Sequence, residues 1–159
     1  MGRALRLLVL LTALHYGDAT QGFAQDSQWV VWDLKTQPVS RTEIILTITA
    51  NLAPGWHIYS QRLSDDGPLP TRIIFDEKDS YLPIGETDEL GNKTRFYSDI
   101  YETYIEWFTG MVSFRQKFRI HEPVTTIRGK IEYMTCNDDT CVPARREFAI
   151  EVNLLKPRQ

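Results

Sequence analysis

Hydrophobic residues recur at every second position along several segments of the chain. In "TEIILTITA" (42–50), for example, Ile44, Leu46 and Ile48 follow this spacing. Successive side chains of a β-strand point to opposite faces, so the pattern predicts a strand with one buried face. The segments that we predict as strands are 42–50, 56–60, 71–75, 104–108, 111–120, 126–134 and 146–154.

The last three of these segments indicate which residues face the core. Their alternate positions are apolar, and many are β-branched or aromatic, as strands favour. The expected inward-facing residues are Val112, Phe114, Phe118 and Ile120, then Ile127, Ile131 and Tyr133, and finally Phe148, Ile150, Val152 and Leu154. No segment beyond the N-terminal region shows the period of an amphipathic helix.

Turn-forming residues separate the predicted strands at intervals of about 8 to 12 positions. Residues 53–55 and 66–70 are rich in Gly and Pro, and Thr109-Gly110 predicts a hairpin between 104–108 and 111–120. The region 76–101 is less regular, and we interpret its glycosylation sequon at Asn92 as part of an ordinary exposed loop. We predict an all-β protein, an antiparallel β-sandwich with about seven to nine strands in two packed sheets.

The N-terminal residues have the features of an export signal. Arg3 and Arg6 precede a mostly apolar run at 7–14, and residues 22–24 are suited to cleavage by a signal peptidase. We therefore predict a cleavable signal peptide at 1–24, a single domain at 25–159, and a periplasmic location. The apolar run is shorter than the roughly 20 residues of a membrane span, and the mature chain is not expected to insert into a membrane.

Composition and charge narrow the classes of ligand. The formal net charge is −3 and the chain has no basic block, which argues against nucleic-acid binding. Beyond the signal peptide, His57 and His121 do not combine with the two cysteines in a zinc-binding spacing. We expect no metal, no cofactor and a monomeric protein.

The two cysteines of the chain, Cys136 and Cys141, lie close together at the junction of two predicted strands. The alternation of the flanking strands places both sulfurs away from the main core, since Cys136 is out of phase with Tyr133 and Cys141 with Phe148. A disulfide that closes a ring of about six residues contributes roughly 2 kcal/mol, against about 4 to 5 for a loop of a hundred. A disulfide that contributes so little to folding stability suits redox exchange.

Two interpretations of the cysteine pair remain open on these grounds. In the first, the pair is a working dithiol that exchanges with other disulfides. In the second, the protein is a secreted immunoglobulin-like binding module with a purely structural hairpin disulfide, which holds a protein or glycan on an aromatic face. The acids between the cysteines, Asp138 and Asp139, disfavour a thiolate and predict a thiol that reacts slowly without a partner.

Four segments together resemble a known family. They are "PGWHIYSQ" (54–61), "DGPLPT" (66–71), "FYSDIY" (96–101) and "EYMTCNDDTCVPARREFAIEV" (132–152). They are similar to the N-terminal periplasmic domain of DsbD-type thiol:disulfide interchange proteins, in particular to its Bacteroidetes-like version, the disulfide bond corrector domain. The resemblance implies an immunoglobulin-like fold and an electron relay. It implies a transmembrane electron donor, thioredoxin-like proteins or domains as partners, and a role in cytochrome c biogenesis.

The resemblance also implies roles for individual residues. Cys141 matches the cysteine that forms the mixed disulfide with a partner, and Cys136 matches the one that resolves it, so a Cys136–Cys141 disulfide is expected. If catalytic, the protein would be of the protein-disulfide reductase type. The spacing of the pair is one residue shorter than in the best-known members.

The neighbours of the sulfurs follow from the same resemblance. His57 and Tyr59 occupy the alternate strand positions that tyrosines hold beside the disulfide in the family. Phe96 is the expected aromatic cover of the disulfide, and Tyr97 is the second candidate. Acidic residues of the family's cap loop are only loosely matched here, and we assign them no role.

Overall fold

The computed structural model describes residues 28–64 and 66–155, so the predicted signal peptide at 1–24 lies outside the described residues. Within these ranges the chain forms eight strands and no helix, and therefore no helix that could cross a membrane. The strands are β1 (Val30–Pro38), β2 (Glu43–Leu52), β3 (His57–Tyr59), β4 (Arg72–Phe75), β5 (Tyr81–Ser98), β6 (Thr103–Ile120), β7 (Val124–Cys136) and β8 (Cys141–Asn153).

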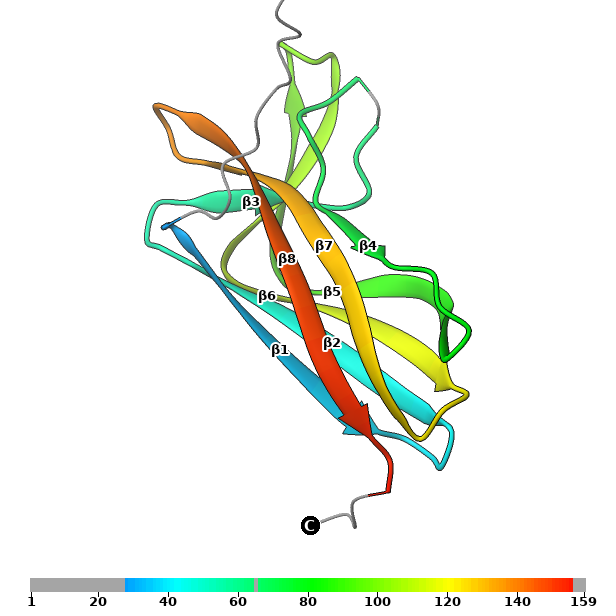
Figure 1. Ribbon diagram of the computed structural model, residues 1–159. Coiled ribbons are helices and arrows are strands. Elements are labelled where there is room, and N and C mark those ends of the chain that lie inside the picture. Colours follow the sequence, from blue (N-terminus) through cyan, green and yellow to red (C-terminus); the bar gives the residue numbers. More distant parts are fainter. Residues whose placement is uncertain (1–27, 65, 156–159) are drawn as a thin grey trace, which may run out of the picture.

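All strand pairs are antiparallel and belong to one sheet with the order β1-β2-β6-β3-β7-β4, to which β5 is added on β6 and β8 on β7. The sheet curls so that its halves face each other, as Figure 1 shows. Trp32 of β1 and Tyr133 of β7 are not on neighbouring strands, yet their rings lie 5.1 Å apart. The predicted immunoglobulin-like sandwich is confirmed, with the difference that short β3 hydrogen-bonds to both halves and joins them.

The main core fills the space between the two halves. The residues predicted to face inward on β2, β6 and β7 are at most 3 % exposed, and Phe148 and Val152 of β8 are also buried. Aromatic rings hold the halves together, for instance Phe75 of β4 against Phe118 of β6 with centroids 4.9 Å apart. Burial of this many large side chains supplies most of the stabilisation of a domain of this size.

The predicted hairpin at Thr109-Gly110 is wrong, because β6 runs without a break through these residues. Gly110 has a φ of 69°, a left-handed conformation that glycine adopts without strain. At this point β6 changes partner: Met111 and later residues pair with β2, whereas 107–109 pair with β3. Gly110 therefore marks the bend at which one strand passes from one part of the sheet to the next.

The region 76–101, which seemed irregular in sequence, contains an 18-residue strand, β5. It pairs with β6 along its whole length, with register shifts near Ile84 and Gly91, and Asn92 lies in the strand rather than in a loop. The first shift is filled by the buried Gln116 side chain, whose Nε2 donates to the carbonyl of Ile84 at 3.0 Å. An edge strand exposed on much of both faces has no apolar alternation, which is why the pattern did not reveal it.

Candidate functional site

The cysteine pair lies at the tip of the β7–β8 hairpin, which projects at the upper left of Figure 1. Cys136 ends β7, Cys141 begins β8, and the two residues face each other in register and form a disulfide. The turn between them is held locally. The amide of Asn137 donates to the carbonyl of Thr140 at 2.9 Å, and the Asn137 side-chain oxygen accepts from the amides of Asp139 and Thr140.

The two sulfurs differ in their surroundings. Cys136 is 1 % exposed, whereas Cys141 is exposed. Cys136 does not belong to the main core: Tyr133 and Thr135 of β7 face the sandwich interior, so Met134 and Cys136 face the opposite side of the sheet. An attacking thiolate therefore finds Cys141 accessible and Cys136 shielded.

A second apolar cluster buries Cys136 on this outer side. We call it the aromatic cluster and define it as His57, Tyr59, Phe96 and Trp107 with the sulfur of Cys136. Tyr59 and Cys136 are buried here together with Ile105, and Leu63, Phe96, Trp107 and Met134 pack against these three residues. Trp107 is central: its ring centroid lies 4.2 Å from that of His57 and 4.6 Å from that of Phe96.

Strand pairing brings these residues together from distant parts of the chain. On β3, His57 lies opposite Cys136 of β7 and Thr109 of β6, and Tyr59 lies opposite Trp107. The chain is fixed here by two side-chain hydrogen bonds, from Thr135 Oγ1 to the carbonyl of His57 and from the buried Thr71 Oγ1 to that of Tyr59. Trp107 is not among the residues predicted for the site, although its spacing of two from Ile105 indicates a second apolar face on this strand.

His57 is a half-buried imidazole whose Nε2 is buried and, within the described residues, has no hydrogen-bond partner. Burial lowers the pKa of His57 below its usual value of 6.5, and the negative charge of Asp138 in the hairpin turn offsets part of this effect. The ring is therefore neutral at pH 7. Burial also raises the pKa of Tyr59 above 10.0, with a smaller contribution from Tyr101, so this phenol stays protonated.

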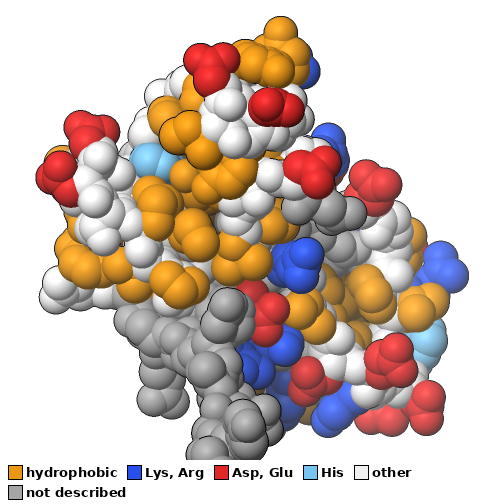
Figure 2. Space-filling model, turned by 90° about the horizontal axis from the view of Figure 1, so that it is seen from above, with side chains coloured by type: hydrophobic (Ala, Val, Ile, Leu, Met, Phe, Trp, Pro, Cys, Tyr) orange, Lys and Arg blue, Asp and Glu red, His pale blue; other side chains and the backbone are white. Residues whose placement is uncertain are grey.

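Phe96 and its neighbour Tyr97 have different environments. Phe96 is part of the aromatic cluster, but Tyr97 is 53 % exposed and lies against Tyr104, with centroids 5.4 Å apart. The β5–β6 hairpin ends in the turn 99–102, where Ile100 is 89 % exposed. We call Tyr97, Ile100, Tyr101 and Tyr104 the hairpin tip; hydrophobic side chains gather over this end of the molecule, with acidic ones beside them (Figure 2).

The acidic residues near the cluster have structural contacts. The Glu89 side chain is 2 % exposed and accepts hydrogen bonds from Ser60 Oγ at 2.7 Å and from the amide of Gln61 at 2.6 Å, and it is paired with Lys93. It fixes the chain after β3 to β5. By alternation along β5 and β6, the ion pair of Lys93 with Glu106 lies on the sheet face opposite Trp107.

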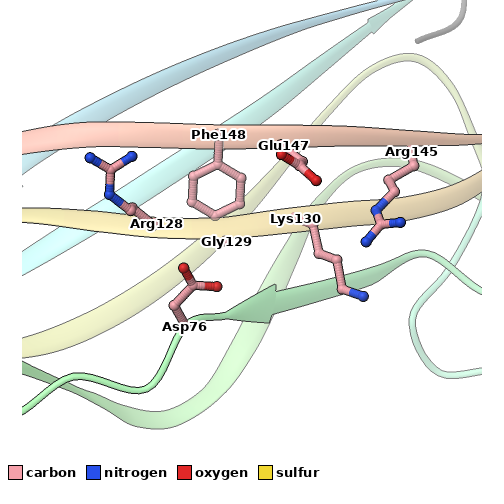
Figure 3. A pocket seen from close by; sticks show the side chains of 7 residues that line it. All are labelled: Asp76, Arg128, Gly129, Lys130, Arg145, Glu147 and Phe148. Carbon is pink, nitrogen blue, oxygen red and sulfur yellow. The ribbon is translucent and has the colours of Figure 1, made fainter. Parts of the chain in front are cut away.

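A shallow hollow of about 340 Å³ lies elsewhere, on β7, β8 and the end of β4 (Figure 3). Its walls are Asp76, Arg128, Gly129, Lys130, Arg145, Glu147 and Phe148. At about 3.3 Å per residue, the wall residue Arg145 is roughly 13 Å along β8 from Cys141, and Lys130 is roughly 20 Å along β7 from Cys136, so this hollow is separate from the disulfide. No group of three His, Cys, Asp or Glu side chains suited to a metal ion occurs among the described residues.

Comparisons with known proteins point to one family. Residues 26–153 match the family described as "Thiol:disulfide interchange protein DsbD, N-terminal". Among curated protein sequences, a direct comparison finds no match.

Two solved structures have a similar fold. The N-terminal periplasmic domain of ScsB from Proteus mirabilis aligns with a TM-score of 0.57 and 14 % identity over 82 % of this chain and 49 % of that one, so the similarity spans about half of the ScsB chain. The reduced DsbD N-terminal domain of Neisseria meningitidis aligns with a TM-score of 0.53 and 14 % identity over 78 % and 86 % of the two chains. With the family match over nearly all of residues 28–155, these findings show that the chain belongs to the family of DsbD N-terminal thiol:disulfide interchange domains.

Proposed function

We propose that the protein is a periplasmic dithiol relay that passes electrons through the Cys136–Cys141 pair. The observation that carries this proposal is the unequal exposure of the two cysteines, since Cys141 is exposed and Cys136 is buried. A partner thiolate attacks Cys141, the bond between the sulfurs breaks, and Cys136 leaves. The second thiol of the same partner then attacks the partner's sulfur in this mixed disulfide, and the bond to Cys141 breaks. The partner leaves with its own two cysteines oxidised to a disulfide, and this domain is left with both cysteines reduced. No cofactor takes part in this chemistry.

The partners proposed are thioredoxin-like proteins or domains and a transmembrane electron donor, with periplasmic disulfide-exchange proteins as acceptors. The hairpin tip supports a docking role, since Ile100 and Tyr104 are 89 % and 54 % exposed beside the disulfide end. Exposed aromatic and aliphatic side chains of this kind are typical of protein contact surfaces. Docking at the tip would bring a partner's thiol to the exposed sulfur of Cys141.

A trapping experiment tests the roles of the two cysteines. Cys136→Ala removes the resolving thiol, so a mixed disulfide through Cys141 should accumulate with thioredoxin-like proteins of a periplasmic extract, identified by mass spectrometry. Cys141→Ala leaves only a buried thiol and should trap far less. Equal trapping by the two variants, or none by either, contradicts the proposal.

A redox titration separates the relay from a binding module with a structural bridge. The oxidised protein is equilibrated with glutathione buffers of graded potential, and free thiols are counted by alkylation and mass spectrometry. A relay disulfide should be reduced within the range of periplasmic exchange proteins. A bridge that stays intact below about −300 mV is a structural one and favours the binding module.

A further inference from the structure

The burial of Cys136 creates a chemical requirement. When the reduced domain passes electrons to a partner, Cys141 forms the mixed disulfide and Cys136 must then attack it as a thiolate. A free thiol with a pKa of about 8.5 is only about 3 % ionised at pH 7. Cys136 is 1 % exposed and packed among apolar side chains, which disfavours the charged form further. A proton acceptor beside this sulfur would remove the difficulty.

His57 is placed to meet this requirement. It is the direct cross-strand partner of Cys136 in the β3–β7 register, so the two side chains leave the sheet on the same face. Directly opposed residues have Cβ atoms about 4.5 to 5.5 Å apart, within reach of an imidazole. Nε2 of His57 is buried with no hydrogen-bond partner among the described residues, an arrangement that leaves one ring nitrogen free for the thiol.

The groups packed around His57 keep it neutral and available. Trp107 of β6 lies against its ring and Tyr59 of its own strand stays protonated. Asp138 of the β7–β8 turn is the charged group that acts on the ring, and it counters part of the effect of burial. On β5 and β6, the charges of Lys93 and Glu106 are paired with each other on the opposite face of the sheet.

We propose that His57 is the base that accepts the proton of the Cys136 thiol in the resolving step. The proposal rests on the relay function proposed above. The thiol proton passes to His57 Nε2, and the Cys136 sulfur forms a bond with the Cys141 sulfur. The bond between Cys141 and the partner breaks, and the partner's cysteine leaves as a thiolate. The imidazolium then returns its proton to solvent. In the reverse direction, the imidazolium protonates Cys136 as it leaves.

Stopped-flow reaction of the reduced protein with Ellman's reagent tests this role without any protein partner. The reagent first reacts with Cys141 and releases one thionitrobenzoate in a phase that depends on reagent concentration. Attack by Cys136 releases the second in a phase that does not. We expect His57→Gln to slow the second phase at pH 7 by about a hundredfold and to leave the first unchanged. The rate of the second phase in the wild type should also fall at a pH below 6.5, with an inflection that the variant lacks.

His121→Gln is the matched control, because His121 lies after β6 with its Nδ1 2.8 Å from the carbonyl oxygen of Asp79, away from the cluster. Its two phases should equal those of the wild type. Equal second-phase rates in His57→Gln and wild type would overturn the proposal. Because no partner is involved, this result is independent of the trapping experiment, which together with the redox titration decides whether the pair serves a relay.

A measurement on the wild type covers the case in which His57→Gln does not fold. With Cys141 blocked by iodoacetamide, the domain mimics the mixed disulfide and keeps a free Cys136. The pKa of His57 in this form is read from its ring proton resonances by NMR. It should coincide with the inflection of the second kinetic phase, and a mismatch or the absence of an inflection would overturn the proposal.

Discussion

The two faces of the sheet carry two apolar clusters of very different character. The main core, inside the sandwich, consists of residues such as Phe114 and Phe118 that are fully buried. The aromatic cluster, on the outer face at the disulfide end, has Cys136 and Tyr59 buried but Phe96 and Trp107 only partly so. The same short strand serves both, since Ile58 is in the core and His57 and Tyr59 are in the cluster.

This difference indicates a division of tasks. The main core consists mainly of packed apolar and aromatic side chains, and removal of any of them costs folding free energy. The aromatic cluster contains the imidazole of His57, whose Nε2 is buried without a hydrogen-bond partner among the described residues, and the sulfur of Cys136, and it lies beside the exposed hairpin tip. We expect its packing to control access to the disulfide and to contribute less to the stability of the domain than the main core does, and the following predictions test that separation.

The largest expected effect is on the stability of the main core. Phe118→Ala removes a ring that is fully buried and contacts Phe75 and Tyr81. The free energy of unfolding should fall by about 3 to 5 kcal/mol, as is usual for a buried aromatic residue. Urea denaturation of the oxidised protein measures it. Met111→Ala, 61 % exposed on the same strand, is the control and should change stability by less than about 0.5 kcal/mol. If Phe118→Ala lowers the free energy of unfolding by no more than the Met111→Ala control does, the assignment of Phe118 to the core is contradicted.

Trp107→Ala should separate stability from reactivity. Its ring is only partly buried, so we expect a loss on the order of 2 kcal/mol, less than for Phe118→Ala. Because the ring packs on His57 and Phe96, its removal opens the cluster, and dithiothreitol should reduce the disulfide several times faster. Stopped-flow tryptophan fluorescence or timed alkylation follows the reduction. Phe118→Ala is measured under conditions in which it stays folded. If it accelerates reduction by dithiothreitol as much as Trp107→Ala does, the two clusters are not functionally distinct.

Phe96→Ala is the finer test of the cover over the disulfide. The ring packs at the edge of the cluster, so its removal should accelerate reduction by dithiothreitol modestly and change stability by about 1 kcal/mol or less. The adjacent Tyr97→Ala is a matched control, because that ring is exposed and lies against Tyr104 outside the cluster. A rate equal to that of the wild type for Phe96→Ala would remove Phe96 from the site.

The smallest effect concerns pH. The pKa of His57 is lowered in the folded protein, so its contribution to stability is complete above pH 6.5 and is lost as the pH falls toward the folded value. Asp138→Asn removes the charge that raises this pKa, and the loss should then extend to lower pH. Thermal denaturation between pH 7 and 5 measures the change, and His57→Gln should flatten this part of the profile. An unchanged profile in both variants would mean that His57 does not titrate in this range.

The sequence predicted the main core because each of its strands has one buried face. Ile44, Phe114 and Ile131 all follow the period of two and are all buried. The same rule failed for segments that do not form a regular strand with one buried face. β5 is paired with β6 and largely exposed, so its residues carry no alternation, and Gly110 looked like a turn although it bends a continuous strand.

The candidate site was predictable only in part, for a geometric reason. The cysteines are close in sequence, and the phase of β7 already placed Cys136 outside the main core. Trp107 joins them only because short β3 pairs with both β6 and β7, and no local pattern encodes that bridge. The unequal burial of the two cysteines likewise depends on side chains from several strands, which alternation along one strand cannot report.

Because the hairpin disulfide closes only a small ring, it affects how the partners of a relay would dissociate. The β7–β8 ladder pairs from Val124 to Cys136 and its turn is closed by the amide of Asn137, so the strands stay aligned without the covalent bond. Oxidised and reduced domains then present nearly the same surface to a partner. A change in the shape of the docking surface therefore cannot cause the partner to dissociate after electron transfer. Docking must therefore be weak enough to end by itself once the covalent link is gone, because tight binding would convert each product into an inhibitor of the next cycle.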